Sequence, residues 1–407
     1  MRPKVVWAAV AVAVAGLGPQ AFAQRGATAS GPDERVKPLV ARLDLERYKA
    51  TIKGLTQFGD RRQGTDRNRA AVDWIEAQLK SYGCPTERVK YEYKTPPPNP
   101  NPPANAAGRG SASDAPPTAA GGGRPRGIRT RTSVNTDPNA QPDAKLRALN
   151  MQPTADGPRE EVFCTKVGTT RADEMYIIGA HMDGHGWGEA ANDDGSGTAL
   201  VMELARVFNS SDVETERTIR FALWNNEETG LNGAAAYVAQ RKDLQGRENP
   251  PGSGRYPEPK WLGMVQHDMM MFDHGMPLPD GTMRKEQRPE ADVNIEFQSN
   301  AKLAGEAQTL AWTWHRANER YASDYPAKVG NHMTNTDSTP FMDLVASISV
   351  RENERGTEIG SGWDPQWHQP TDVYTTYTDS DFRLGLNAAQ TTGGAVALLA
   401  GAKLSAP

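Results

Sequence analysis

This sequence of 407 residues has few cysteines, few long apolar runs and no large excess of one charge. The only cysteines are Cys84 and Cys164, so a single disulfide can form in an oxidising compartment, and two buried thiols are the alternative. The 46 basic and 50 acidic side chains give a net charge of −4, or −6 without residues 1–23. This balance argues against a general nucleic-acid-binding role.

The one long apolar run lies in residues 1–23, which are typical of a secretory signal peptide. Arg2 and Lys4 form a basic start, Val5–Leu17 is the apolar core, and Ala21–Ala23 has the small residues of a cleavage site. The core is shorter than the roughly 20 residues of a membrane-spanning helix, which favours cleavage over an uncleaved anchor. The residue directly after the cleavage site is Gln24 and not a cysteine, which argues against a lipid anchor there. We therefore expect a secreted or periplasmic protein that is not associated with a membrane.

The N-terminal part of the mature chain is predicted to be helical, followed by one strand. Apolar positions from Leu39 to Leu55 recur at helical spacing, and Thr65 can cap a second helix that ends at Gly83. Val89–Tyr93 alternates like a strand. From about residue 95 to 143 the composition changes to Pro, Gly, Ala, Asn and Ser, which cannot bury enough apolar surface to become ordered. We predict a disordered insertion there.

The rest of the chain alternates strands with helices, and no internal repeat is present. This pattern predicts one α/β domain over residues 24–407, interrupted by the insertion. We expect a three-layer α/β/α sandwich whose central sheet is mixed but mostly parallel, because the first two strands can pair antiparallel. The predicted strands are Val162–Val167, Met175–Ala180, Thr218–Trp224, Trp261–Gln266 and Ala346–Val350, and the predicted helices are 197–208, 230–240, 301–317 and 380–404.

Candidate metal ligands follow the ends of the predicted strands. His181 and Asp183 come directly after the second buried strand, and Glu227 with Glu228 closes the next one. Open α/β sheets bind ligands at the carboxyl ends of their strands. A metal-bound histidine usually donates its second ring nitrogen to a carboxylate, and Asp183 is a candidate for that partner. The adjacent glutamates can supply one ligand and one base.

Three further residues extend the pattern. Asp193 lies in an Asp-Asp-Gly-Ser-Gly turn that opens a helix, Asp268 follows an apolar strand, and His368 lies in a polar loop before the final helix. Taken alone, each acid is equally typical of a turn or a helix cap, and the histidine of an exposed loop. Their joint order and spacing indicate a two-metal hydrolytic site, in which Asp193 can bridge the cations.

In these motifs the chain resembles the secreted di-zinc aminopeptidases of the co-catalytic metallopeptidase family. Relatives of that family include bacterial leucyl aminopeptidases, glutamate carboxypeptidase II, the transferrin receptor and glutaminyl cyclase. The resemblance covers roughly residues 40–94 and 160–400. It implies a zinc-dependent exopeptidase that hydrolyses N-terminal residues from peptides, through a water bridging two Zn²⁺ ions and a glutamate base. A single-zinc glutaminyl cyclase, a carboxypeptidase and a non-catalytic binding module are the alternatives on the same scaffold, and no oligomeric state is predicted.

The resemblance also implies roles for individual residues. Glu227 would be the general base, Asp183 would support His181, and the peptide bond between Asp193 and Asp194 would be cis. The implied metal ligands are His181 and Asp268 for one zinc, Glu228 and His368 for the other, and Asp193 as the bridge.

The chain departs from the family pattern at Trp367, where many relatives carry a tyrosine whose hydroxyl can help to stabilise the oxyanion. His185, His267 and His332 lie near the motifs but match no family ligand, and a pocket or packing role is favoured for each. Asp337 lies in a stretch that resembles a loop near the family's substrate pocket, and a site-supporting role and a simple turn are equally compatible with it.

Overall fold

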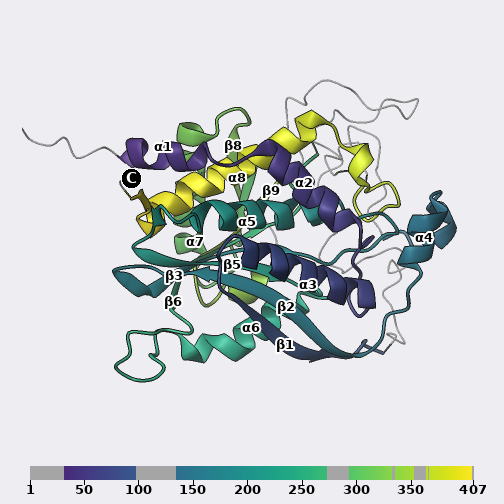
Figure 1. The fold of residues 1–407 in the computed structure, drawn as a ribbon, viewed down its shortest axis with the longest axis horizontal. Coiled ribbons are helices and arrows are strands. Elements are labelled where there is room, and N and C mark those ends of the chain that lie inside the picture. Colours follow the sequence, from purple (N-terminus) through teal and green to yellow (C-terminus); the bar gives the residue numbers. More distant parts are fainter. Residues whose placement is uncertain are drawn as a thin grey trace, which may run out of the picture.

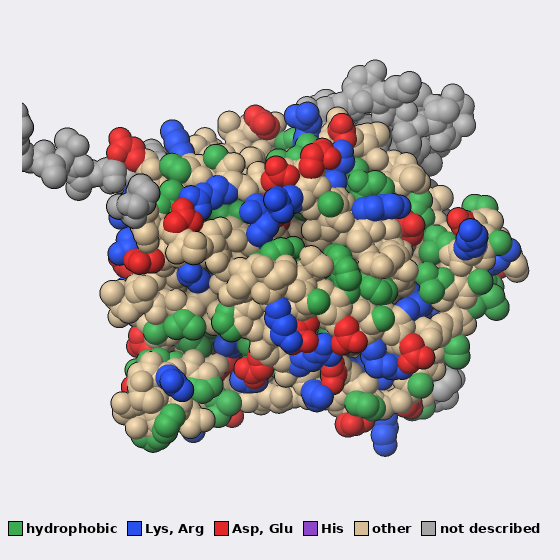
Figure 2. Space-filling view, in the orientation of Figure 1, with side chains coloured by type: hydrophobic (Ala, Val, Ile, Leu, Met, Phe, Trp, Pro, Cys, Tyr) green, Lys and Arg blue, Asp and Glu red, His purple; other side chains and the backbone are tan. Residues whose placement is uncertain are grey.

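The structure is a computed structural model that describes residues 32–97, 134–272, 293–331, 335–352, 364 and 366–405. The predicted signal peptide and most of the predicted insertion lie outside these residues. Among the helices that are described, none combines the length and apolar character required to cross a bilayer. Figure 2 shows acidic and basic side chains interspersed over one face of the molecule, in keeping with the balanced composition.

An eight-stranded mixed sheet forms the middle of the molecule, and its strand order is β1-β2-β5-β3-β6-β9-β7-β8 (Figure 1). Neighbouring strands are parallel from β5 through β3 and β6 to β9, and again between β7 and β8. They are antiparallel at β1–β2, β2–β5 and β7–β9. The predicted mixed, mostly parallel sheet is therefore confirmed. The strands are β1 Thr86–Tyr93, β2 Gly157–Lys166, β3 Arg171–His181, β5 Arg217–Trp224, β6 Lys260–His267, β7 Val293–Phe297, β8 Ala327–Asn331 and β9 Ser347–Arg351, with β4 Val213–Glu214 and β10 Lys403–Leu404 pairing separately.

Helices cover both faces of the sheet, and the alternation of side chains along β3 explains why. Ile178 packs into a large core with α3, α5, α7 and α8, whereas its neighbour Ile177 packs into a smaller core with α6. Figure 1 shows α5 and α8 on one side of the strands and α6 on the other. The helices are α1 Pro32–Val40, α2 Leu45–Thr56, α3 Asp66–Ser81, α4 Ala144–Asn150, α5 Gly195–Phe208, α6 Asn232–Arg241, α7 Ala304–Tyr321 and α8 Asp379–Ala400.

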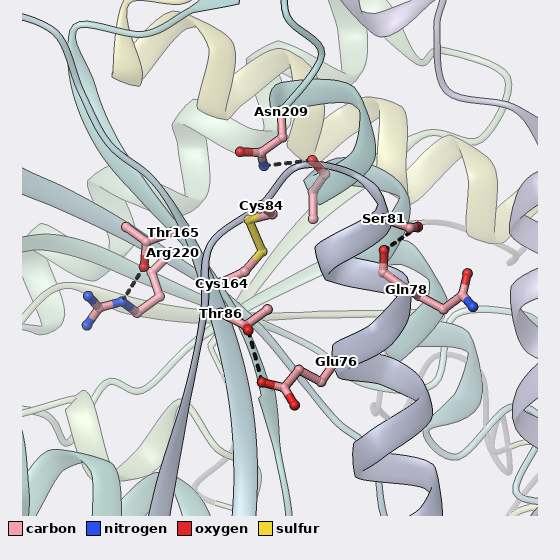
Figure 3. The surroundings of a disulfide bond; sticks show 10 residues. Glu76, Gln78, Ser81, Cys84, Thr86, Cys164, Thr165, Asn209 and Arg220 are labelled. Carbon is pink, nitrogen blue, oxygen red and sulfur yellow. Dashed lines mark hydrogen bonds between the residues drawn. A yellow bond between two sulfur atoms is a disulfide. The ribbon is translucent and has the colours of Figure 1, made fainter.

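Cys84 and Cys164 form a disulfide, which decides between the two alternatives that the sequence left open. The bond joins the residues after α3 to β2, beside the hydrogen bond from Thr86 to Glu76 (Figure 3). Both cysteines are buried, and they lie 80 residues apart in the sequence. The disulfide therefore attaches the N-terminal helices to the central sheet across the insertion.

The end of the predicted insertion is ordered, contrary to the composition-based prediction. The backbone N–H of Asn135 donates to the carbonyl of His368 at 3.0 Å. The side-chain amide of Gln141 donates to the carbonyls of Trp187 (2.8 Å) and Pro370 (2.9 Å). Hydrogen bonds to loop backbone thus order residues 134–143, although they have few apolar side chains to bury.

The strands β7 and β8 were not predicted, and the final helix ends earlier than expected. β7 carries two buried polar residues, Asn294 and Glu296, which obscure its strand pattern. Helix α8 ends at Ala400, because Gly401 adopts a left-handed conformation with φ +66°, and the chain then forms β10.

Candidate metal centre

The predicted ligands and the predicted base converge at the carboxyl ends of the central strands. A cavity there is lined by His181, Asp193, Glu227, Glu228, Asp268, Asn335, Arg351, Trp367 and His368. Three parallel strands deliver four of these residues, because β3 ends at His181, β5 precedes the glutamate pair and β6 precedes Asp268. Most of these side chains are buried, with Glu227 9% exposed and Glu228 partly exposed.

Two groups of donor atoms share the carboxylate of Asp193. In the first group, Nε2 of His181 lies 3.3 Å from Oδ1 of Asp193 and 3.8 Å from Oδ1 of Asp268. In the second, Nε2 of His368 lies 2.9 Å from Oδ2 of Asp193 and 3.0 Å from Oε2 of Glu228. The donor atoms of His181, Asp193 and Asp268 lie within 4.8 Å of one another, close enough to hold one metal ion, and the same holds for Glu228 and His368 together with His185. Asp193 thus directs one oxygen to each group, as a bridging carboxylate must.

His181 is oriented by a backbone carbonyl rather than by the expected carboxylate. Its Nδ1 lies 3.0 Å from the carbonyl oxygen of Asp183 and 3.9 Å from the Asp183 carboxylate. Because a carbonyl oxygen only accepts, Nδ1 donates to it, and Nε2 is the ring nitrogen that faces the cavity. The Asp183 carboxylate instead accepts the backbone N–H of Glu227 at 3.0 Å. Asp183 therefore connects the ends of β3 and β5.

The peptide bond between Asp193 and Asp194 is cis, as the family resemblance implies. Asp194 accepts backbone N–H groups from Gly197, His181 and Met269, at 2.8, 3.1 and 3.2 Å. Its carboxylate therefore caps α5 and ties this turn to the ends of β3 and β6, while the Asp193 side chain faces the donor groups.

Arg351, at the end of β9, is a site residue that the sequence analysis missed. Its Nη2 donates to Oδ2 of Asp268 at 2.7 Å, so that Oδ1 is the oxygen facing His181. Burial acts to raise the pKa of Asp268, but the positive charges of Arg351 and His181 lower it to about 2. The sequence signal for Arg351 was a charged residue directly after a predicted strand. Charged residues are common in loops, so this signal is not specific to a site.

The charges in the cavity are those of a cation-binding site. Burial acts to lower the pKa of His368, yet Glu228 and Asp193 raise it to about 10. Burial raises the pKa of Glu227 well above its usual value, and the negative charge of Glu228 adds to this effect. Buried polar atoms without a hydrogen bond include Oδ2 of Asp193 and Oε1 of Glu228. Imidazole and carboxylate groups that are buried and lack hydrogen bonds are suited to bind a divalent metal such as zinc.

The loop between β3 and α5 is held by Arg61, which sequence reasoning also missed. The buried guanidinium donates to the carbonyls of Met182, Glu189 and Ala190 at 2.7, 2.8 and 2.8 Å. Gly186 of this loop, with φ +97°, packs directly against the His368 backbone, where a Cβ would lie 2.4 Å from the carbonyl carbon. The loop path thus depends on these contacts.

The remaining residues singled out in the sequence have different positions. Trp367 stacks on the His368 ring with centroids 4.0 Å apart and lines the cavity. His267 packs in the core, where its two ring nitrogens contact the carbonyl of Gly179 and the hydroxyl of Thr392. Asp337 is buried close to Gln266, whose amide lies 3.4 Å from its carboxylate. His185 lies beside the second donor group, and His332 lies outside the described residues.

Comparison with known proteins identifies a family. The model of peptidase family M28 matches residues 162–390, which include every candidate ligand and the candidate base. The probable lipoprotein aminopeptidase LpqL of Mycobacterium tuberculosis is 27% identical over 223 residues, which cover 53% of this chain and 41% of that protein. A probable zinc metalloprotease of Pyricularia oryzae is 26% identical over 335 residues, which cover 79% of this chain and 52% of that protein. The chain therefore aligns with about half or less of the length of these relatives.

Solved structures share the fold. An aminopeptidase from Aneurinibacillus sp. strain AM-1 superposes with a TM-score of 0.58 and 21% identity, over 92% of this chain and 97% of that one. A glutaminyl cyclase from Porphyromonas gingivalis gives a TM-score of 0.51 and 15% identity, over 88% and 98%. At these identities the likeness shows a common α/β architecture, which is compatible with more than one chemistry.

Proposed function

The chain belongs to peptidase family M28, and from this premise we propose that it is a zinc-dependent aminopeptidase that removes N-terminal residues from peptides. The observation that carries the proposal is the pair of donor groups on either side of the Asp193 carboxylate, with Glu227 on the wall of the same cavity. The names of the aminopeptidase relatives support the same assignment.

Two zinc ions are the proposed cofactors. His181 and Asp268 would hold one, Glu228 and His368 the other, and Asp193 both. When bound, such a pair of metals acidifies water and polarises the scissile carbonyl. The arrangement of Arg351 and of the Asp183 carbonyl then serves to turn Asp268 and His181 toward the metal.

Glu227 is the proposed general base. In the metal-free protein, burial and the adjacent negative charge of Glu228 raise its pKa, which favours acceptance of a proton. It would take the proton of the attacking water and deliver it to the leaving amine. The hydrogen bond from the backbone N–H of Glu227 to Asp183 would position Glu227 for this transfer.

The side chains that line the cavity favour an aminopeptidase over a carboxypeptidase. Among the described residues that line it, Arg351 is the only arginine or lysine, and Asp268 accepts its hydrogen bond. A carboxypeptidase requires a cationic side chain directed at the substrate carboxylate, and the one candidate among these residues is already bound to Asp268. The second donor group also favours the aminopeptidase over a single-zinc glutaminyl cyclase, because it provides a site for a second metal.

A secreted or periplasmic location is part of the proposal. The Cys84–Cys164 disulfide supports it, since disulfides persist mainly in oxidising compartments. The basic and apolar composition of residues 1–23 agrees with export.

The test is to measure zinc per chain together with hydrolysis of aminoacyl-nitroanilides, N-terminal glutamine peptides and C-terminally extended peptides. Glu227→Gln should keep its zinc and lose about 10²–10⁴-fold in kcat. Glu306→Gln, on the exposed face of α7, is the matched control and should match the wild type. Two bound zinc ions without any aminopeptidase activity would contradict the proposal, and one zinc with pyroglutamate formation would favour the cyclase.

A further inference from the structure

His185 approaches the second donor group as closely as the expected ligand His368 does. Its Nε2 lies 3.0 Å from Oε2 of Glu228, and Nε2 of His368 lies 3.0 Å from the same oxygen. The two imidazole rings are nearly perpendicular, at 88°, with centroids 4.0 Å apart. Both histidines therefore direct the same ring nitrogen at one carboxylate oxygen.

Nε2 of His185 is buried and is not aligned in a hydrogen bond, in spite of its short distance from Glu228. A buried imidazole nitrogen that makes no well-aligned hydrogen bond costs free energy, which ligation to a metal would recover. The donor atoms of His185, Glu228 and His368 all lie within 4.8 Å of one another. This spacing and donor chemistry are suited to one zinc ion.

Contacts at two places hold the loop that carries His185. Arg61 holds the loop by its carbonyls at Met182, Glu189 and Ala190, and Gly186 packs against the backbone of His368. The ring is therefore presented by a packed loop rather than by a side chain that extends freely into the cavity.

We propose that His185 is a metal ligand of the second donor group, in addition to Glu228, His368 and the shared Asp193. This inference rests on the proposed two-zinc function. It makes the centre asymmetric, with four protein ligands for the second metal and three for the first. Because four protein ligands are typical of a closed zinc site and three leave a position open, the second zinc should be the more tightly held.

The first test is a zinc titration of the full mature chain against a competing chelator, for the wild type, His185→Phe and a control. Phenylalanine keeps a planar ring but removes both nitrogens. His315→Phe is the matched control, because His315 lies on α7, away from the cavity, beside Glu319. Circular dichroism of the metal-free proteins verifies that each variant is folded.

Loss of a residue that only supports a ligand typically weakens metal binding by roughly 10–100-fold. A ligand role therefore predicts that His185→Phe weakens one zinc site by more than about 100-fold. The other site and the His315→Phe variant should retain wild-type affinities. A smaller loss would overturn the proposal, since it would make His185 a positioning residue for Glu228. If the wild type itself binds fewer than two zinc ions, the proposed function fails, which is a separate outcome.

The second test needs no variant and uses the cobalt-substituted wild-type protein. Each imidazole bound to Co²⁺ through Nε2 gives one exchangeable, strongly shifted proton signal from its Nδ1–H. Three such signals, from His181, His185 and His368, would support the proposal. Two signals in a protein with two bound Co²⁺ ions would overturn it.

Discussion

Replacement of Gly186 by alanine tests how far the metal centre depends on backbone packing. Gly186 has φ +97°, and an added Cβ would lie 2.4 Å from the carbonyl carbon of His368 and 2.5 Å from its oxygen. These are backbone atoms and cannot rotate away as the end of a side chain can. The loop that carries His368 must therefore move if the alanine is to fit.

The expected loss of stability in Gly186→Ala has two contributions. An alanine in a left-handed conformation loses about 1–2 kcal/mol, and overpacking typically costs a further 1–3 kcal/mol or so. Gly186→Ala should thus lower the free energy of unfolding by about 2–5 kcal/mol. Gly83→Ala isolates the first contribution, because Gly83 has φ +74° and no atom within 4 Å of an added Cβ.

Urea denaturation of the metal-free proteins measures the loss of stability in both variants. A zinc titration measures metal binding by the second donor group. We expect a larger loss for Gly186→Ala than for Gly83→Ala, together with weakened binding of one zinc ion in the former alone. Equal losses for the two variants, or unchanged zinc binding in Gly186→Ala, would refute the packing argument.

Two further predictions concern the disulfide and the protonation of the ligands. Reduction of Cys84–Cys164 should lower the free energy of unfolding by about 2–4 kcal/mol, because the bond closes a long loop in the unfolded chain. An unchanged denaturation midpoint after complete reduction would count against this. Zinc affinity should rise with pH by up to about tenfold per unit between pH 6 and 8, since zinc must displace the proton that His368 holds up to a pKa of about 10. Calorimetry in buffers of different ionisation enthalpy measures the proton release, and a pH-independent affinity would be incompatible with it.

The part of the fold that was predictable from sequence consists of strands with continuous apolar runs. β3, β5 and β6 are of this kind, and their carboxyl ends meet in a parallel arrangement. Ligand positions at those ends could therefore be inferred from the order of the elements. β7 was not predictable in the same way, because its buried Asn294 and Glu296 give it the composition of a loop.

The ordered end of the insertion shows a second limit. Composition predicts whether a segment can bury apolar surface, but residues 134–143 are ordered by hydrogen bonds to the backbone of other loops. Such partners depend on where those loops pass, which local sequence does not encode. The same reason applies to Arg61, whose buried guanidinium binds three carbonyls more than 100 residues away.

The position of His185 also depends on contacts with distant segments. This explains why the sequence motifs gave it a pocket or packing role and not that of a ligand. A ligand at a strand end is positioned by the sheet, whereas a ligand in a loop is positioned only if other segments hold the loop. Here Arg61 and the close contact between Gly186 and the His368 backbone provide that support. A relative with the same five motif ligands but without these supports would not bring a loop histidine to Glu228. The coordination of the second metal should therefore depend on the loop between β3 and α5 as much as on the motif itself.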